Sequence, residues 1–277
     1  MELTALDKVD LVIEAVFENM SVKKDVFVEL DKICKPGAIL ASNTSYLDLD
    51  EIAGTTSRPE DVIGLHFFSP AHVMRLLEIV VGAKTDQRVT STGFALAKRL
   101  RKIGVKAGVC DGFIGNRILA HYRKTAAYLV LDGASPQEVD RALEEFGFAM
   151  GPHKVGDLAG LDIDWMTRQR KALTRREEER YYGNVADRIC EKGWFGRKSG
   201  KGYYLYEANN MLPNPEVETI IAEERQKASI TPKAIATSDI VDRCMTAIIS
   251  EAVGVLEDKI AARPLDIDMV LLFGYGF

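Results

Sequence analysis

The first third of the chain alternates short apolar runs with amphipathic segments, and this alternation constrains the fold more than any other feature of the sequence. The runs that predict strands are Val9–Val16, Ala38–Ala41, Val62–Phe68, Leu76–Val81 and Val105–Val109. Helical spacing of apolar residues begins near Ser21, which we expect to cap a helix, near Asp48 and near Thr90, where the helix is predicted to extend to Ile103. Strands separated by helices indicate an α/β fold with a mostly parallel, Rossmann-like sheet. We expect the first strand to be buried on both faces.

From about residue 108 onward the pattern becomes helical. A long helix is predicted over Ile114–Leu131, and Ser135-Pro136-Gln137-Glu138 has the form of a capping box with proline at the first helical position. The charged stretch Leu161–Cys190 is also expected to be helical, and Gly193–Gly202 a loop. The sequence therefore predicts an α/β part followed by an all-α part.

An internal repeat lies in the helical part. Its paired segments are Asn116-Arg117 with Asp242-Arg243, Pro136–Asp140 with Pro264–Asp268, and Gly147-Phe148 with Gly276-Phe277. Chance similarity between amphipathic helices is the alternative, but we favour a duplicated helical unit. The domains are then predicted to be residues 1–107, part of a Rossmann-like domain, residues 108–206, a first helical copy, and residues 207–277, a second and incomplete copy.

Charge and composition argue against several classes of protein. Lys and Arg number 36 against 41 Asp and Glu, a net charge of -5, whereas nucleic-acid binders usually carry a basic excess. No apolar run reaches the roughly 18 residues that a membrane span needs, and we expect no signal peptide. The four cysteines are scattered without a C-x-x-C pair, so we expect reduced thiols and no metal site. The expected location is the cytoplasm, with the peroxisome as the alternative if the source is eukaryotic.

Polar residues lie at or near the ends of the predicted strands, where ligands bind in open α/β sheets. Ser42-Asn43-Thr44-Ser45 follows one strand, His66 ends another, and Asn116 opens the long helix. Each has a structural alternative: a capping turn, a core histidine or a helix cap. Glu78 lies between apolar neighbours in a strand and is harder to explain structurally, because a buried carboxylate needs a partner. A histidine and a glutamate brought together make an acid/base unit, since the carboxylate fixes the tautomer of the imidazole.

The motifs together resemble one enzyme family. The segments LVIEAVFEN, ASNTSYL, GLHFFSPAHVMRLLEIV, CDGFIGNRIL, MGPHKVGDLAGLD and FGRKSGKGYYLY are similar, in order, to blocks of the L-3-hydroxyacyl-CoA dehydrogenases. The GNR block, the SPAHVM variant and the duplicated unit resemble the multifunctional β-oxidation proteins, which carry an enoyl-CoA hydratase domain ahead of the dehydrogenase. The resemblance implies NAD-dependent oxidation of L-3-hydroxyacyl-CoA to 3-ketoacyl-CoA.

The resemblance also implies roles for single residues. His66 corresponds to the catalytic base, and Glu78 to the carboxylate that orients it. Ser45 and Asn116 correspond to residues that bind the 3-oxygen of the substrate and position the histidine. The positions near the nicotinamide and its ribose are those of Glu18, Lys23 and Asn43. NAD is the implied cofactor and an acyl-CoA the implied substrate.

One departure from the family is prominent. The sequence holds no G-x-G-x-x-G turn, which in the family binds the pyrophosphate of NAD at a helix N-terminus. We therefore expect a fragment or a remodelled relative, with an exposed sheet edge and weak or no NAD binding by the isolated chain.

Three hypotheses follow. The first is a hydroxyacyl-CoA dehydrogenase, or a piece of one. The second is another 3-hydroxyacid dehydrogenase, a group that typically uses a lysine base, and the HFFSP block argues against it. The third is a non-catalytic helical scaffold for assembly. The oligomeric state stays open between a monomer whose repeats pair within the chain and a homodimer.

Overall fold

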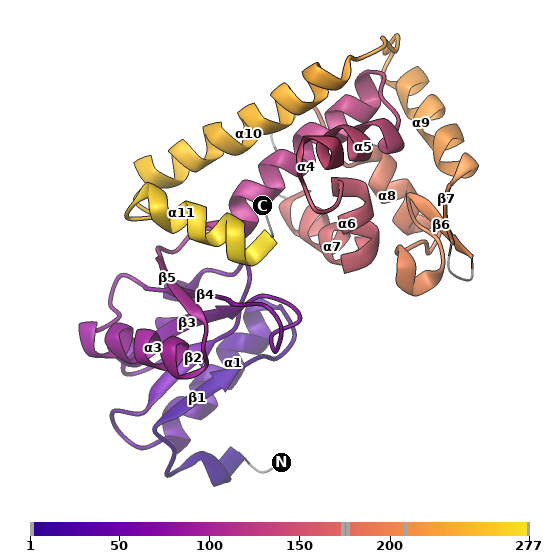
Figure 1. Cartoon of the computed structure of the whole chain (residues 1–277). Helices are drawn as coiled ribbons and strands as arrows, with labels where there is room; N and C mark the ends of the chain where they lie inside the picture. Colours follow the sequence, from indigo (N-terminus) through magenta and orange to yellow (C-terminus); the bar gives the residue numbers. More distant parts are fainter. Residues whose placement is uncertain (1–2, 173–174, 176–177, 208–209, 276–277) are drawn as a thin grey trace. The chain divides into compact units, whose positions relative to one another are not determined.

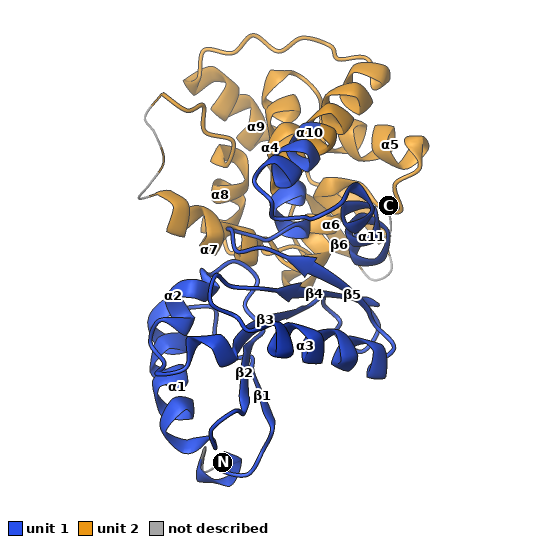
Figure 2. Cartoon of the chain, turned by 90° about the vertical axis from the view of Figure 1, so that its left-hand side faces the viewer, with its two compact units in different colours: residues 1–119, 250–277 blue, residues 120–249 orange. Residues whose placement is uncertain are grey.

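The computed structural model describes residues 3–172, 175, 178–207 and 210–275, and the chain divides into two compact units. Unit 1 comprises residues 1–119 and 250–277, and unit 2 comprises residues 120–249 (Figure 2). The long helices α4 (Gly115–Asp132) and α10 (Thr237–Glu257) contribute residues to both units. The predicted domain limits at residues 107 and 206 stay a prediction. Gly276-Phe277, the last pair of the proposed repeat, lies outside the described residues.

Unit 1 is built on a five-stranded sheet, and the predicted α/β fold with a parallel-dominated sheet is confirmed. The strands lie in sequence order: β1 (Leu11–Glu14), β2 (Ile39–Ser42), β3 (Val62–Phe67), β4 (Leu76–Val80) and β5 (Ile103–Ala107) (Figure 1). The pairs β1–β2, β2–β3 and β4–β5 are parallel, whereas β3 and β4 are antiparallel. The chain reverses there because the connection from Phe68 to Arg75 is shorter than the dozen or more residues of a parallel crossover.

The first strand differs from its prediction. Among the described residues β1 pairs only with β2, so one of its edges is open. Leu11 and Val12 are half-buried, and Ile13 is 40% exposed. The expectation of burial on both faces was therefore wrong, since an apolar run alone does not distinguish an edge strand from a central one.

Three helices belong to the α/β part of unit 1: α1 (Met20–Ile33), α2 (Leu49–Ala53) and α3 (Gln87–Arg99). Asn19, not Ser21, caps α1, because its side chain accepts a hydrogen bond from the backbone N–H of Val22. Helix α3 ends before the predicted Ile103, since Arg101 has a φ of 57° and Ile103 already pairs in β5.

The two faces of the sheet have different roles. Ile63, Leu65, Leu77 and Ile79 point to one face, where they pack against Val89 and Ala97 of α3. Side chains alternate along a strand, so His66 and Glu78 point to the opposite face. The opposite face is also where Leu49 of α2 approaches Gly64 and where Gly274 approaches Leu76. The candidate site therefore lies on the face away from α3.

Unit 2 consists mainly of helices. Its elements are α5 (Pro136–Phe146), α6 (Pro152–Ala159), α7 (Leu161–Ala172), α8 (Asn184–Glu191), β6 (Tyr204–Glu207), β7 (Asn210–Pro213) and α9 (Pro215–Lys227), together with most of α4 and the first part of α10. The capping box of Ser135 with Glu138 is confirmed. The helical character predicted for Leu161–Cys190 is found in α7 and α8, whereas the described residues 178–183 between them are not helical.

The two copies of the proposed repeat share an order of elements. In each, a long helix (α4 or α10) is followed by a shorter helix that starts with proline, α5 at Pro136 and α11 (Pro264–Val270) at Pro264. Val139 and Ile267, which correspond in the repeat, are both buried. The shared order supports a duplicated helical unit.

Two buried aspartates connect the strand β6 to the helices of unit 2. Asp140 accepts hydrogen bonds from the Tyr204 hydroxyl at 2.7 Å and from the His153 backbone N–H at 2.9 Å. Asp157 accepts from the backbone N–H groups of Tyr203 and Tyr204, each at 3.0 Å. Burial raises the pKa of Asp157 to about 6 in spite of these donors.

Candidate active site

The antiparallel pairing of β3 with β4 places His66 directly opposite Glu78. The Nδ1 atom of His66 lies 2.6 Å from Oε2 of Glu78. The two residues are buried, with exposed fractions of 4% and 0%. A buried carboxylate needs donors, and the imidazole N–H is one of them.

The second oxygen of Glu78 is held by the start of helix α4. Oε1 accepts hydrogen bonds from the backbone N–H groups of Ile114 at 3.2 Å and of Gly115 at 3.0 Å, which have no partner within the helix. Both oxygens of Glu78 are then acceptors, so the proton between the two side chains belongs on Nδ1 of His66. The hydrogen-bond network thereby assigns a tautomer in which Nε2 is left with a lone pair.

An unusual turn directs these backbone donors. Gly112 has a φ of 84° and Phe113, a bulky residue, a φ of 50°. A side chain at Gly112 would approach the backbone N of Arg117 to 2.9 Å, so the turn requires glycine there. The ring of Phe113 and the ring of Phe68 lie 5.8 and 4.6 Å from that of His66, centroid to centroid. The imidazole therefore lies among aromatic carbon.

Asn116 and Ser45, predicted from different parts of the chain, lie close together. Nδ2 of Asn116 donates to the backbone carbonyl of Ser45 at 3.4 Å, and its Oδ1 accepts from the hydroxyl of Tyr275 at 2.7 Å. The Ser45 hydroxyl makes no hydrogen bond to another residue within the described ranges. Asn116 follows directly on Gly115, whose backbone N–H donates to Glu78. The start of α4 therefore contacts both the His66–Glu78 pair and, through Asn116, Ser45.

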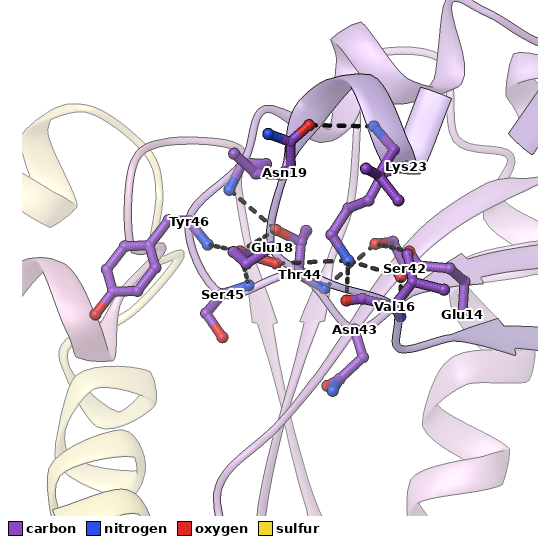
Figure 3. Close-up of polar contacts among 12 residues, drawn as sticks. Glu14, Val16, Glu18, Asn19, Lys23, Ser42, Asn43, Thr44, Ser45 and Tyr46 are labelled. Carbon is purple, nitrogen blue, oxygen red and sulfur yellow. Dashed lines mark hydrogen bonds and ion pairs between the residues drawn. The ribbon is translucent and has the colours of Figure 1, made fainter. Parts of the chain in front are cut away.

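The predicted cofactor residues Glu18 and Lys23 take part in a network of polar contacts that Figure 3 shows. The ammonium of Lys23, whose side chain is 1% exposed, lies 2.7 Å from Oε1 of Glu14 and 3.4 Å from Oε2 of Glu18. Glu14 also accepts from the Ser42 hydroxyl at 2.8 Å. Lys23 is thus surrounded by protein, and it can influence a ligand only through Glu18.

Glu18 holds the turn that follows strand β2. Its Oε1 accepts from the Thr44 hydroxyl at 2.6 Å and from the backbone N–H groups of Ser45 at 2.8 Å and Tyr46 at 3.1 Å (Figure 3). Its side chain is 35% exposed, so it combines this structural role with access to solvent. The third predicted cofactor residue, Asn43, accepts from the backbone N–H of Phe67 at 2.9 Å and connects the ends of β2 and β3.

These residues fit one end of an NAD molecule. Glu18 and Asn43 lie at the ends of β1 and β2, where a nucleoside could meet a carboxylate and the amide NH2 group of Asn43. The glycine-rich turn that would hold the pyrophosphate is not present in the sequence.

Among the described residues no group of three His, Cys, Asp or Glu side chains could hold a metal ion. In the same part of the chain no helix has the length and apolar character of a membrane span.

Sequence reasoning missed two members of the site. Glu14 lies in an apolar strand, and the criterion that singled out Glu78 applies to it equally. Tyr275 carries no local signal, because it meets Asn116 across 159 positions of sequence.

Comparison with known protein families identifies the family of this chain. Residues 1–110 match the model of the 3-hydroxyacyl-CoA dehydrogenase NAD binding domain, and residues 112–206 match that of the C-terminal domain of the same enzymes. The chain belongs to the 3-hydroxyacyl-CoA dehydrogenase family. The predicted resemblance is thereby confirmed, and so is NAD as the cofactor of the matched domain.

Relatives from this family include the peroxisomal bifunctional enzymes. The chain is 45% identical to that of Danio rerio over 100% of its own length and 47% identical to that of Homo sapiens over 98%. It spans 40% and 39% of the lengths of those two proteins. Among solved structures of the family, 3-hydroxybutyryl-CoA dehydrogenase of Escherichia coli is 28% identical with a TM-score of 0.83, covering 100% of this chain and 74% of that one. The dehydrogenase part of multifunctional enzyme 1 of C. elegans is 31% identical with a TM-score of 0.65, covering 99% and 62%.

Proposed function

We propose that the chain carries the catalytic residues for NAD-dependent oxidation of L-3-hydroxyacyl-CoA to 3-ketoacyl-CoA in fatty-acid β-oxidation. The observation that carries the proposal is the buried contact of 2.6 Å between Nδ1 of His66 and Glu78. Family membership supports the reaction class, and the site's geometry supports the residues.

His66 is the proposed general base. While its Nδ1–H donates a hydrogen bond to Glu78, its Nε2 lone pair accepts the proton of the substrate's 3-hydroxyl group. Glu78 keeps the imidazole in this tautomer and stabilises the positive charge that forms when the proton arrives. In the reverse direction the same imidazole returns the proton to the 3-oxygen.

The side chains of Ser45 and Asn116 are proposed to bind the 3-oxygen. One N–H of the Asn116 amide is directed to the carbonyl of Ser45, and the other, with the Ser45 hydroxyl, is available to an oxygen that gains negative charge. NAD+, when bound, takes the hydride from C3 of the substrate. Glu18 and Asn43 are the residues proposed to contact its nicotinamide nucleoside, and Lys23 is proposed to act through Glu18.

The cellular setting is proposed from the relatives. Because the proteins that this chain is similar to are named peroxisomal, the peroxisome is favoured over the cytoplasm, which stays a prediction without direct support. An acyl-CoA is the proposed substrate partner. Pairing of the helical copies within one chain and homodimer formation both stay open, and light scattering distinguishes them.

The decisive experiment is the reverse reaction. Acetoacetyl-CoA and NADH are mixed with the chain, and NADH consumption is followed at 340 nm, with NADH binding measured in parallel by calorimetry. Turnover supports the proposal. NADH binding without turnover contradicts it, and the absence of both leaves the non-catalytic helical scaffold or a dehydrogenase fragment that does not bind the cofactor by itself.

A further inference from the structure

Tyr275 reaches the candidate active site from the far end of the chain. It closes a π-helical turn, Leu271–Tyr275, that follows α11 within unit 1. Its hydroxyl lies 2.7 Å from Oδ1 of Asn116, and its ring meets that of Phe68 edge-on, with centroids 5.5 Å apart and an interplanar angle of 84°. Phe68 in turn contacts the ring of His66. π-helical turns are rare and frequent at functional sites.

Two glycines make this close approach possible. A Cβ atom at Gly115 would lie 3.0 Å from the ring of Tyr275, and one at Gly274 would lie 2.8 Å from Leu76. Any larger residue would push the tyrosine away from the start of α4. The contact therefore depends on the absence of side chains at both positions.

The segment before Tyr275 is fixed to the same body as the sheet. The guanidinium of Arg117 forms ion pairs with Glu251 and, at 2.8 Å, with Asp258. The backbone N–H of Gly108 donates to the carbonyl of Ile260 at 2.8 Å. Arg75 covers the ring of Phe273 at 5.0 Å from its centroid. These three sets of contacts fix the position of the segment that carries Tyr275 relative to the sheet.

The hydrogen bonds of Asn116 admit only one orientation of its amide. The Ser45 carbonyl can only accept, so it requires the NH2 group on its side. The opposite orientation would direct Oδ1 at the Ser45 carbonyl oxygen, two acceptors facing each other. With the NH2 group toward Ser45, the Oδ1 atom needs a donor, and the Tyr275 hydroxyl supplies it.

We propose that Tyr275 is a positioning residue that keeps the NH2 group of Asn116 directed at the 3-oxygen of the substrate. The inference rests on the proposed function, in which Asn116 donates to that oxygen. Tyr275 touches neither substrate nor cofactor in this scheme. It acts through Asn116, so its removal weakens recognition of the 3-oxygen and leaves recognition of the rest of the thioester unchanged.

Two thioesters separate these effects. Acetoacetyl-CoA has a 3-oxygen and butyryl-CoA has none, and an NMR titration of the full chain measures both dissociation constants even when they are weak. The wild-type chain should bind acetoacetyl-CoA more tightly. Tyr275→Phe keeps the ring and loses one hydrogen bond. The dissociation constant of butyryl-CoA divided by that of acetoacetyl-CoA should therefore fall by about threefold to tenfold, while the dissociation constant of butyryl-CoA itself is unchanged. Tyr128→Phe, which removes a hydroxyl bonded to the Arg180 carbonyl in unit 2, is the matched control.

A double-mutant cycle shows whether the effect passes through Asn116. In an Asn116→Ala background, Tyr275→Phe should cause no further change in the ratio. An unchanged ratio in Tyr275→Phe, or a full additional loss in the double variant, would overturn the inference. A wild-type chain that does not distinguish the two thioesters would refute the proposed function itself, together with the inference.

Discussion

Replacing Glu78 by glutamine tests the tautomer of His66 on which the catalytic scheme depends. The carboxylate accepts from Nδ1 of His66 and from the backbone N–H groups of Ile114 and Gly115. In Glu78→Gln the amide oxygen can keep the two backbone bonds, which turns the NH2 group toward Nδ1. Two donors then face each other unless the imidazole proton moves to Nε2. The variant therefore forces the tautomer that has no lone pair at Nε2.

The expected magnitudes differ for stability and for catalysis. A charge-assisted hydrogen bond is exchanged for a neutral one, so the free energy of unfolding should fall by only about 1–2 kcal/mol. Loss of the base should lower kcat by a factor on the order of 10²–10⁴. Glu78→Ala instead leaves His66 and two backbone groups without their acceptor and should cost about 3–5 kcal/mol.

The assay does not require turnover. The ¹⁵N chemical shifts of the His66 ring report which nitrogen carries the proton, and urea denaturation reports stability. We expect a proton on Nδ1 in the wild-type chain and on Nε2 in Glu78→Gln. The same tautomer in both proteins would refute the reasoning.

Three other changes have defined outcomes. Lys23→Met removes the cation from a buried ion pair and should lower the free energy of unfolding by about 3–5 kcal/mol. The control Lys24→Met, at a half-buried lysine whose partner Glu51 is exposed, should cost about 0–1 kcal/mol. Equal urea midpoints for the two variants would contradict this. Because burial raises the pKa of Asp157 from its ordinary 3.8 to about 6, the folded chain holds a proton that the unfolded chain has released between these values. The wild type should therefore lose about 3 kcal/mol of stability relative to Asp157→Asn as the pH rises from about 3 to 7. Parallel pH profiles of the two proteins would exclude that shift. Gly196→Ala, whose new Cβ would lie 2.2 Å from the Asp157 carbonyl, should lower the thermal midpoint clearly more than Gly193→Ala. Gly193 also has a positive φ, but the space around it is open. A reversed order of the two midpoints would argue against this packing.

Much of the fold could be predicted from local sequence. Apolar runs located all five strands of unit 1 to within a few residues, and the capping box at Ser135 located the start of α5. The exposure of Ile13 could not be predicted, because it depends on which strands lie beside β1. The reversal between β3 and β4 could have been recognised from their short connection.

The candidate site was predictable where one strand carried the signal. Glu78 stood out as a carboxylate among apolar neighbours, and its contact with His66 agrees with the expected acid/base unit. Lys23 was predicted from the family resemblance alone, as a residue near the nicotinamide, and only the packing of α1 shows that its ammonium is buried against Glu14. The contact of Tyr275 with Asn116 arises from tertiary structure alone.

The most direct test of the central claim compares two histidines that lie six positions apart in the sequence. His66 is buried against Glu78, whereas His72, six positions on, is exposed. With acetoacetyl-CoA and NADH at 340 nm, His66→Gln should lower kcat by a factor on the order of 10²–10⁴, and His72→Gln should leave it unchanged. Undiminished turnover by His66→Gln would contradict the assignment of His66 as the catalytic base.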